Sequence, residues 1–125
     1  MISSQQSLGY RLSRQQERMW RSGAQKEALV ARIRVEGAVD PLRLRDALRR
    51  SIERHEILRT RIEATPGASM PSQIIDDLPI EIAIEDFDGA APAEQRRLIE
   101  GVESELRARR HETDALQIAI LRFSS

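Results

Sequence analysis

The chain has 125 residues, which is enough for one domain or for one lobe of a larger domain. It contains no cysteine, which excludes disulfides and thiolate metal sites, and its 20 basic and 20 acidic residues give a formal net charge of zero. No apolar run approaches the roughly 20 residues of a membrane span. We therefore expect a cytoplasmic protein with no membrane partner.

The charges are unevenly spread along the chain. Residues 1–62 hold 14 basic and 7 acidic residues, whereas residues 63–125 hold 6 and 13. A basic N-terminal half is suited to an acidic partner such as a carrier protein, a phosphate group or nucleic acid. The alternative is that the two halves fold together and neutralise each other.

The N-terminal part predicts one helix and one strand. Residues 1–11 are polar and are expected to be flexible, and residues 12–125 are expected to form a single domain. Ser13 can cap a short helix that runs to about Arg21 and ends at Ser22 and Gly23. Apolar and mostly charged residues then alternate over 29–36, which predicts a strand with one buried face.

A longer helix and three strands are predicted next. Asp40 and Pro41 are a favourable helix start, and an apolar face at helical spacing continues to about His55. Four arginines lie largely off that face: Arg43, Arg45, Arg49 and Arg50. Alternation predicts strands near 58–62 and 80–85, and a short strand is expected around 72–75 between turns at 65–67 and 76–77.

The C-terminal part predicts a helix and a last strand. Ala90, Ala91 and Pro92 open a helix that should end near Arg110. Asp86 and Asp88 are interpreted as turn residues. Residues 116–123 are almost continuously apolar, which favours a central strand buried on both faces. The order α-β-α-β-β-β-α-β indicates an α/β (α+β) fold with a mixed sheet covered by helices.

Three segments carry a family resemblance, two of them through motifs. Residues 54–61 read Arg-His-Glu-Ile-Leu-Arg-Thr-Arg, and residues 12–20 read Leu-Ser-Arg-Gln-Gln-Glu-Arg-Met-Trp. In this order they resemble the R-H-E-x-L-R-T-x-F and L-S-x-A-Q-x-R-L/M-W motifs of the condensation domains of nonribosomal peptide synthetases. Ile62 stands in place of the final Phe, and Gln15 in place of Ala. The last strand also resembles the family's P-L-L-R-A-x-L segment.

The resemblance implies the N-terminal lobe of a fold like that of chloramphenicol acetyltransferase. Full condensation domains join an amine to a carrier-bound thioester, and the phosphopantetheine arms of carrier proteins enter a tunnel between two lobes. Their H-H-x-x-x-D-G motif is missing here, because the chain has two histidines, His55 and His111, and neither lies in such a motif. The resemblance therefore implies a truncated lobe without catalytic residues, directly bound cofactors or metal.

The resemblance also assigns residues to two supporting roles. Residues of the second motif would hold the absent catalytic loop: Arg54, His55, Glu56, Arg59 and Thr60. Residues of the first motif would build the N-terminal helix: Ser13, Gln16, Arg18 and Trp20. Taken as residues alone, both histidines are more typical of helix ends than of a catalytic base, and Trp20 is more typical of a packing anchor.

Two further functions remain open from the sequence. One is a non-catalytic module whose arginine-rich helix docks a carrier protein through Arg45 and Arg49. The other, nucleic-acid binding, is disfavoured by zero net charge and the scarcity of aromatic residues. A lone lobe would expose the face that meets the C-terminal lobe, so we also expect that lobe or a second copy of the chain as a partner.

Overall fold

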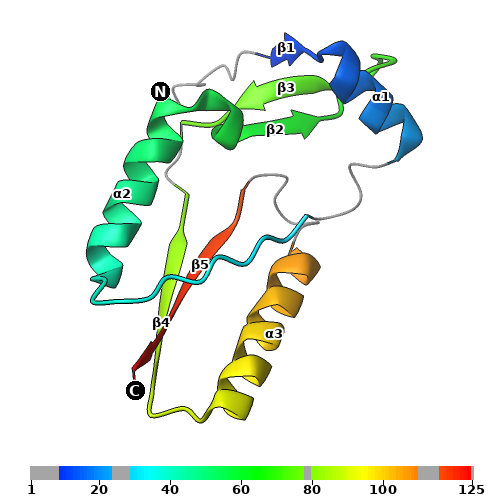
Figure 1. Ribbon diagram of the computed structural model, residues 1–125. Helices are drawn as coiled ribbons and strands as arrows, with labels where there is room; N and C mark the ends of the chain where they lie inside the picture. Colours follow the sequence, from blue (N-terminus) through cyan, green and yellow to red (C-terminus); the bar gives the residue numbers. More distant parts are fainter. Residues whose placement is uncertain (1–8, 24–28, 78–79, 110–115, 125) are drawn as a thin grey trace, which may run out of the picture.

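The computed structural model describes residues 9–23, 29–77, 80–109 and 116–124. In these residues three α-helices accompany two small sheets, so the protein is a mixed α/β protein. One sheet lies at one end of the molecule, and the second lies between two helices at the other end (Figure 1). The single mixed sheet expected from the sequence is therefore divided into two.

The first sheet is antiparallel and has the strand order β1-β3-β2. Strand β1 is Gly9–Arg11, β2 is Thr60–Glu63 and β3 is Ser72–Ile75. The central strand β3 places Ile74 opposite both Gly9 and Arg61. The sequence predicted β3 correctly and placed the second strand slightly too early. It missed β1, which lies in the segment expected to be flexible.

Helix α1 (Arg14–Ser22) starts and ends where the sequence predicts. The Ser13 hydroxyl accepts a hydrogen bond from the Gln16 N–H at 3.2 Å, and the Gln16 side chain accepts one from the Ser13 N–H at 2.8 Å. This reciprocal capping box satisfies two N–H groups that a helix start leaves unpaired. Gly23 ends the helix at a φ of 76°, a conformation that glycine adopts without strain.

Helix α2 (Pro41–Arg54) is also confirmed, including its start. The Asp40 carboxylate accepts a hydrogen bond from the Leu42 N–H at 3.0 Å, and Pro41 occupies the first turn. Ile52, near the end of the helix, is buried. The short 3₁₀ helix η2 (Glu56–Arg59) follows and replaces the first half of the strand that the alternation of residues 58–62 predicts.

The second sheet consists of two parallel strands, β4 (Ile82–Asp88) and β5 (Ile118–Ser124). Helix α3 (Pro92–Ala108) connects them and lies beside β5, while α2 lies on the other side of the pair (Figure 1). Among the described residues β5 pairs with β4 alone, so it is half-buried rather than the fully buried central strand that the sequence predicts.

The C-terminal ends of β4 and β5 differ from a further prediction. Asp86 and Asp88 belong to β4 and are not turn residues. Ring stacking of Phe87 on Phe123, with centroids 5.7 Å apart, joins the two strands near the same ends. The strand predicted from the apolar run at 116–123 is confirmed as β5, and its partner β4 continues three residues beyond the predicted end at residue 85.

The strand predicted over residues 29–36 does not form. This segment is extended but belongs to neither sheet, and it runs from the region of α3 to the start of α2 (Figure 1). Leu29 is 97% exposed, Ile33 84% and Val35 58%. A period-two pattern needs a paired neighbour to become a strand, and the described part of the chain supplies none.

Burial is sparse in the described residues. The buried apolar residues among them are Leu12, Ile52, Ile74 and Ile82. Three of these four lie in or next to the first sheet and α2. Within the described ranges, no helix combines the length and the apolar character that crossing a membrane requires.

Candidate functional site

The second motif occupies the junction between α2 and β2. His55 ends α2 by donating its backbone N–H to the Ile52 carbonyl at 3.3 Å, and Leu58 donates to the His55 carbonyl at 3.0 Å. The Thr60 hydroxyl then donates to the Glu56 carbonyl at 2.7 Å. These local bonds turn the chain from a helix through η2 into the first sheet.

Arg59 is the motif residue that joins distant parts of the chain. Its side chain is 16% exposed. One terminal nitrogen, Nη1, donates to the Asp76 carbonyl at 2.9 Å and to the Asp77 carboxylate at 3.3 Å. The other, Nη2, reaches the Glu53 carbonyl at 3.4 Å. The guanidinium thus links the last turn of α2 to the segment after β3. Its bond to Glu53 satisfies one of the carbonyls that the helix end leaves unpaired.

Arg61 continues the same network on β2. Its Nε lies 3.0 and 3.2 Å from the two carboxylate oxygens of Asp76, and its Nη1 lies 2.5 Å from Glu63. The hydrogen bond to Glu63 is the main cause of a raised pKa of Arg61, and burial of the side chain opposes it. Asp76, which was predicted to be a turn residue, therefore accepts hydrogen bonds at two groups. Its carboxylate accepts from Arg61, and its backbone carbonyl accepts from Arg59.

The first three motif residues do not take part in this network. The side chains of Arg54, His55 and Glu56 are all exposed. No side-chain hydrogen bond or ion pair joins them to one another in the described part of the protein. Within this motif it is therefore Arg59, and not Arg54, His55 or Glu56, whose side chain links two elements.

The first motif attaches to the same strand, β3. Gln16 donates to the Gln73 side-chain oxygen at 3.1 Å, and Gln73 donates to the Arg11 carbonyl at 2.8 Å. Trp20 is half-buried and Arg18 is exposed. Two motifs that lie far apart in the sequence therefore both bind to β3 and its flanks, one through Gln73 and the other through Asp76.

The two arginines predicted to dock a carrier protein are less accessible than expected. Arg45 and Arg49 are both half-buried, and the Nε atom of each is buried without a hydrogen-bond partner. Arg43 and Arg50 are exposed. The helical spacing assigned all four to the outer side of α2, but Arg45 and Arg49 lie at its border, where their aliphatic stems can pack.

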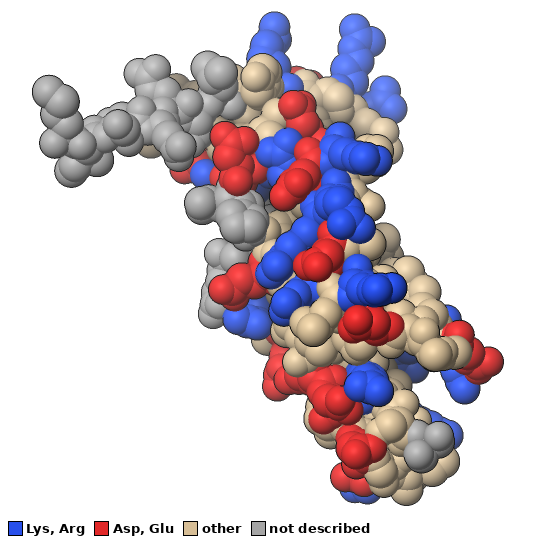
Figure 2. Space-filling view, turned by 90° about the vertical axis from the view of Figure 1, so that its left-hand side faces the viewer, with Lys and Arg blue, Asp and Glu red and all other residues tan. Residues whose placement is uncertain are grey.

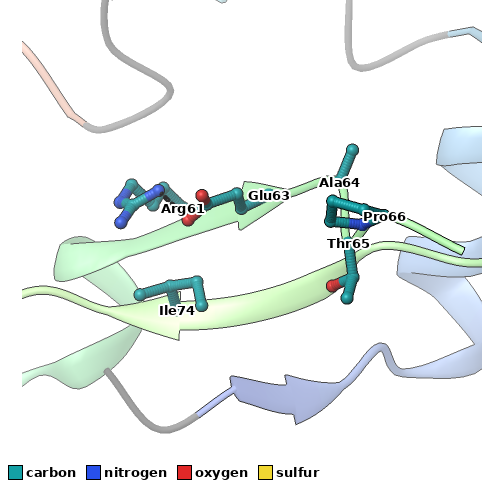
Figure 3. A pocket seen from close by; sticks show the side chains of 6 residues that line it. All are labelled: Arg61, Glu63, Ala64, Thr65, Pro66 and Ile74. Carbon is teal, nitrogen blue, oxygen red and sulfur yellow. Dashed lines mark hydrogen bonds and ion pairs between the residues drawn. The ribbon is translucent and has the colours of Figure 1, made fainter. Parts of the chain in front are cut away.

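An open hollow of about 370 Å³ lies on one side of the first sheet (Figure 3). Arg61 and Ile74 form one end, and Thr65 and Pro66 of the turn form the other. The turn is as predicted, with Gly67 at a φ of 79° and a bond of 3.1 Å from Ala68 to Thr65. The lining holds one carboxylate, Glu63, which forms an ion pair with Arg61.

Several participating residues were not singled out from the sequence. Asp76, Glu63 and Gln73 make the decisive contacts, but nothing in their local pattern distinguishes them from ordinary turn and strand residues. His111 lies outside the described residues. Within the described ranges, no group of three or more metal-binding side chains comes together.

Comparisons with known proteins give a limited result. No family model matches the chain, and no solved structure matches it. Among curated proteins it is similar to the AMB antimetabolite synthetase AmbE of Pseudomonas aeruginosa strain PAO1, with 32% identity over 82 residues. The match covers 65% of this chain and 4% of that synthetase, so the chain spans a small part of its relative's length. The similarity relates the protein weakly to nonribosomal peptide synthetases.

Proposed function

We propose that the chain is the N-terminal lobe, or a truncated form, of a condensation domain from a nonribosomal peptide synthetase or a hybrid polyketide–peptide assembly line. The observation that carries the proposal is the attachment of both motifs to β3 and the residue that follows it, through Gln16 to Gln73 and through Arg59 to Asp76. Motif residues that hold two helices onto one strand build a frame. The similarity to an antimetabolite synthetase supports the same assignment.

In this proposal the chain alone forms no amide bond. Attack of an amine on a thioester requires a positioned base and a site that excludes water. His55 is exposed at the end of α2, and the hollow beside Arg61 is open. The frame instead positions a catalytic loop supplied by further sequence, and the phosphopantetheine arm of a carrier protein brings the thioester.

The reading frame downstream of Ser125 provides the first test. We expect an in-frame H-H-x-x-x-D-G a short hairpin after β5. The extended protein should then form an amide from a carrier-bound thioester and an amine, measured by mass spectrometry, whereas residues 1–125 should not. Product formation by residues 1–125 would contradict the proposal, and so would an extended protein that carries the motif and remains inactive with every carrier pair tried.

The second candidate is a non-catalytic module that docks a carrier protein. Basic side chains gather over the face that Figure 2 shows, with acidic side chains between them. Helix α2 contributes the exposed Arg43 and Arg50 and the half-buried Arg45 and Arg49. Such a surface attracts an acidic partner, and the attraction weakens as salt is added.

Binding of a carrier protein, measured by calorimetry at two salt concentrations, tests this candidate. Charge reversal at Arg45 and Arg49 should weaken it, and the exposed Arg107 of α3 provides the control for charge reversal elsewhere. Circular dichroism separates lost binding from lost folding, which matters for two half-buried residues. Affinity that is indifferent to salt and to these substitutions would exclude docking through α2.

A further inference from the structure

Residues 29–36 have the sequence of a strand and an extended backbone, but no described strand pairs with them. Their apolar residues alternate as in a half-buried strand, whereas Leu29 and Ile33 are 97% and 84% exposed. No backbone hydrogen bond joins the segment to the other described residues. An unpaired, apolar strand edge is a ready template for pairing with another chain.

The two sides of this segment differ. On one side the Arg32 Nε donates to Glu103 of α3 at 2.7 Å, and the bond to Glu103 raises the pKa of Arg32. Arg34 forms an ion pair with Glu36 at 3.0 Å. These charges are already neutralised within the chain. The opposite side, formed by Leu29, Ala31, Ile33 and Val35, faces solvent.

We propose that this segment is a dimerisation strand that pairs antiparallel with the same segment of a second copy. In the register centred on Arg32, Leu29 lies opposite the second copy's Val35, and Ala31 lies opposite its Ile33. Every apolar residue of the exposed side then lies opposite an apolar residue. Because of the two-fold symmetry, each of these two pairs occurs twice in the dimer. The proposal is independent of the assembly-line assignment.

The charges select this register over its neighbours. This register has one like-charge contact, between the two copies of Arg32 on the two-fold axis, and each Arg32 remains bonded to its own Glu103. A shift that centres the pair on Ile33 has two such contacts, because it sets Arg32 opposite Arg34 twice. A shift that centres it on Arg34 draws Gly37, whose φ of 114° is not that of a strand, into the pairing.

The paired surface is small, so the dimer should be weak. One strand pair buries less than the roughly 1,200 Å² of a standard specific interface. We therefore expect a concentration-dependent equilibrium in analytical ultracentrifugation. Hydrogen exchange at residues 29–36 should slow as the protein concentration rises. A monomer at every concentration would overturn the proposal, as would protection of these amides in the monomer, which indicates pairing within one chain.

Disulfide trapping tests the register, because the chain has no cysteine of its own. Ala31→Cys and Ile33→Cys variants, mixed and oxidised, should yield mainly the mixed disulfide. Directly opposite Cβ atoms are about 4.5–5.5 Å apart, whereas diagonal ones are about 7–8 Å apart, which is too far for a disulfide. Equal amounts of mixed and self-linked products would contradict the register.

Ile33→Lys tests the energetics. Because two apolar pairs are lost and two charges are brought together, the dimer should weaken at least about tenfold. Ile33 is mostly exposed, so the monomer should remain folded. Leu42→Lys is the matched control, since Leu42 is also apolar and 56% exposed but lies on α2. Equal effects of the two substitutions would show that the segment is not the interface.

Discussion

The first sheet and residues 29–36 show opposite outcomes of similar sequence patterns. Residues 58–62, which lead into β2, alternate like residues 29–36, but β2 pairs with β3, and Arg59 and Arg61 bond to Asp76 beside it. Residues 29–36, within the part of the chain that the structure describes, have one long-range ion pair and no paired strand. The comparison shows that alternation specifies a strand only where other parts of the chain provide the partner.

The largest expected loss of stability comes from removing a buried apolar side chain. Ile74→Ala in β3 should lower the free energy of unfolding by about 2–4 kcal/mol, because Ile74 is 9% exposed and its loss leaves a cavity. Ile33→Ala, which removes the same atoms from the exposed segment, should change the stability of the monomer by less than about 0.5 kcal/mol. Urea unfolding of both variants at low protein concentration makes the comparison. Equal losses would mean that residues 29–36 are packed in solution.

The next largest loss of stability is expected at the junction between α2 and β2, where Arg59 lies. Arg59→Ala should cost about 1.5–3 kcal/mol in urea unfolding, since it removes bonds to the carbonyls of Asp76 and Glu53 and leaves the Asp76 carbonyl with one donor fewer. Arg54→Ala is the matched control, because Arg54 belongs to the same motif but is exposed, and we expect a change below about 0.5 kcal/mol. A loss at Arg54 as large as that at Arg59 would refute the assignment of the junction to Arg59.

The helices could be predicted from sequence because their signals are local. Ser13 with Gln16 and Asp40 with Pro41 mark helix starts within four residues, and the structure confirms both. The partners of Arg59 could not be predicted in this way, because Asp76 lies 17 residues away and is brought close only when β2 and β3 pair. For the same reason the sequence could not tell that the expected sheet is divided into two.

The capping box allows a smaller test of that local signal. Ser13→Ala removes the acceptor for the Gln16 N–H and should destabilise the protein by about 1 kcal/mol. Ser51→Ala, within α2 on an exposed position, should be neutral or slightly stabilising, because alanine has the higher helix propensity. Thermal unfolding distinguishes the two. A neutral Ser13→Ala would mean that α1 is held by its contact with β3 rather than by its own cap.

The smallest expected effect is that of the ion pair between Arg32 and Glu103. The hydrogen bond from Arg32 lowers the pKa of Glu103 below its ordinary value, and partial desolvation opposes this shift. A group whose pKa is lowered by folding stabilises the folded state above its unfolded pKa, and that contribution is lost as the pH falls through the folded pKa. The pair should therefore hold residues 29–36 against α3 at neutral pH and release them in acid.

Carboxyl chemical shifts measured by NMR should show Arg32→Gln returning the pKa of Glu103 toward its ordinary value. Because Arg34 pairs with Glu36 rather than with α3, Arg34→Gln should leave that pKa unchanged. A titration of Glu103 that is the same in all three proteins would mean that the segment is not held against α3 in solution.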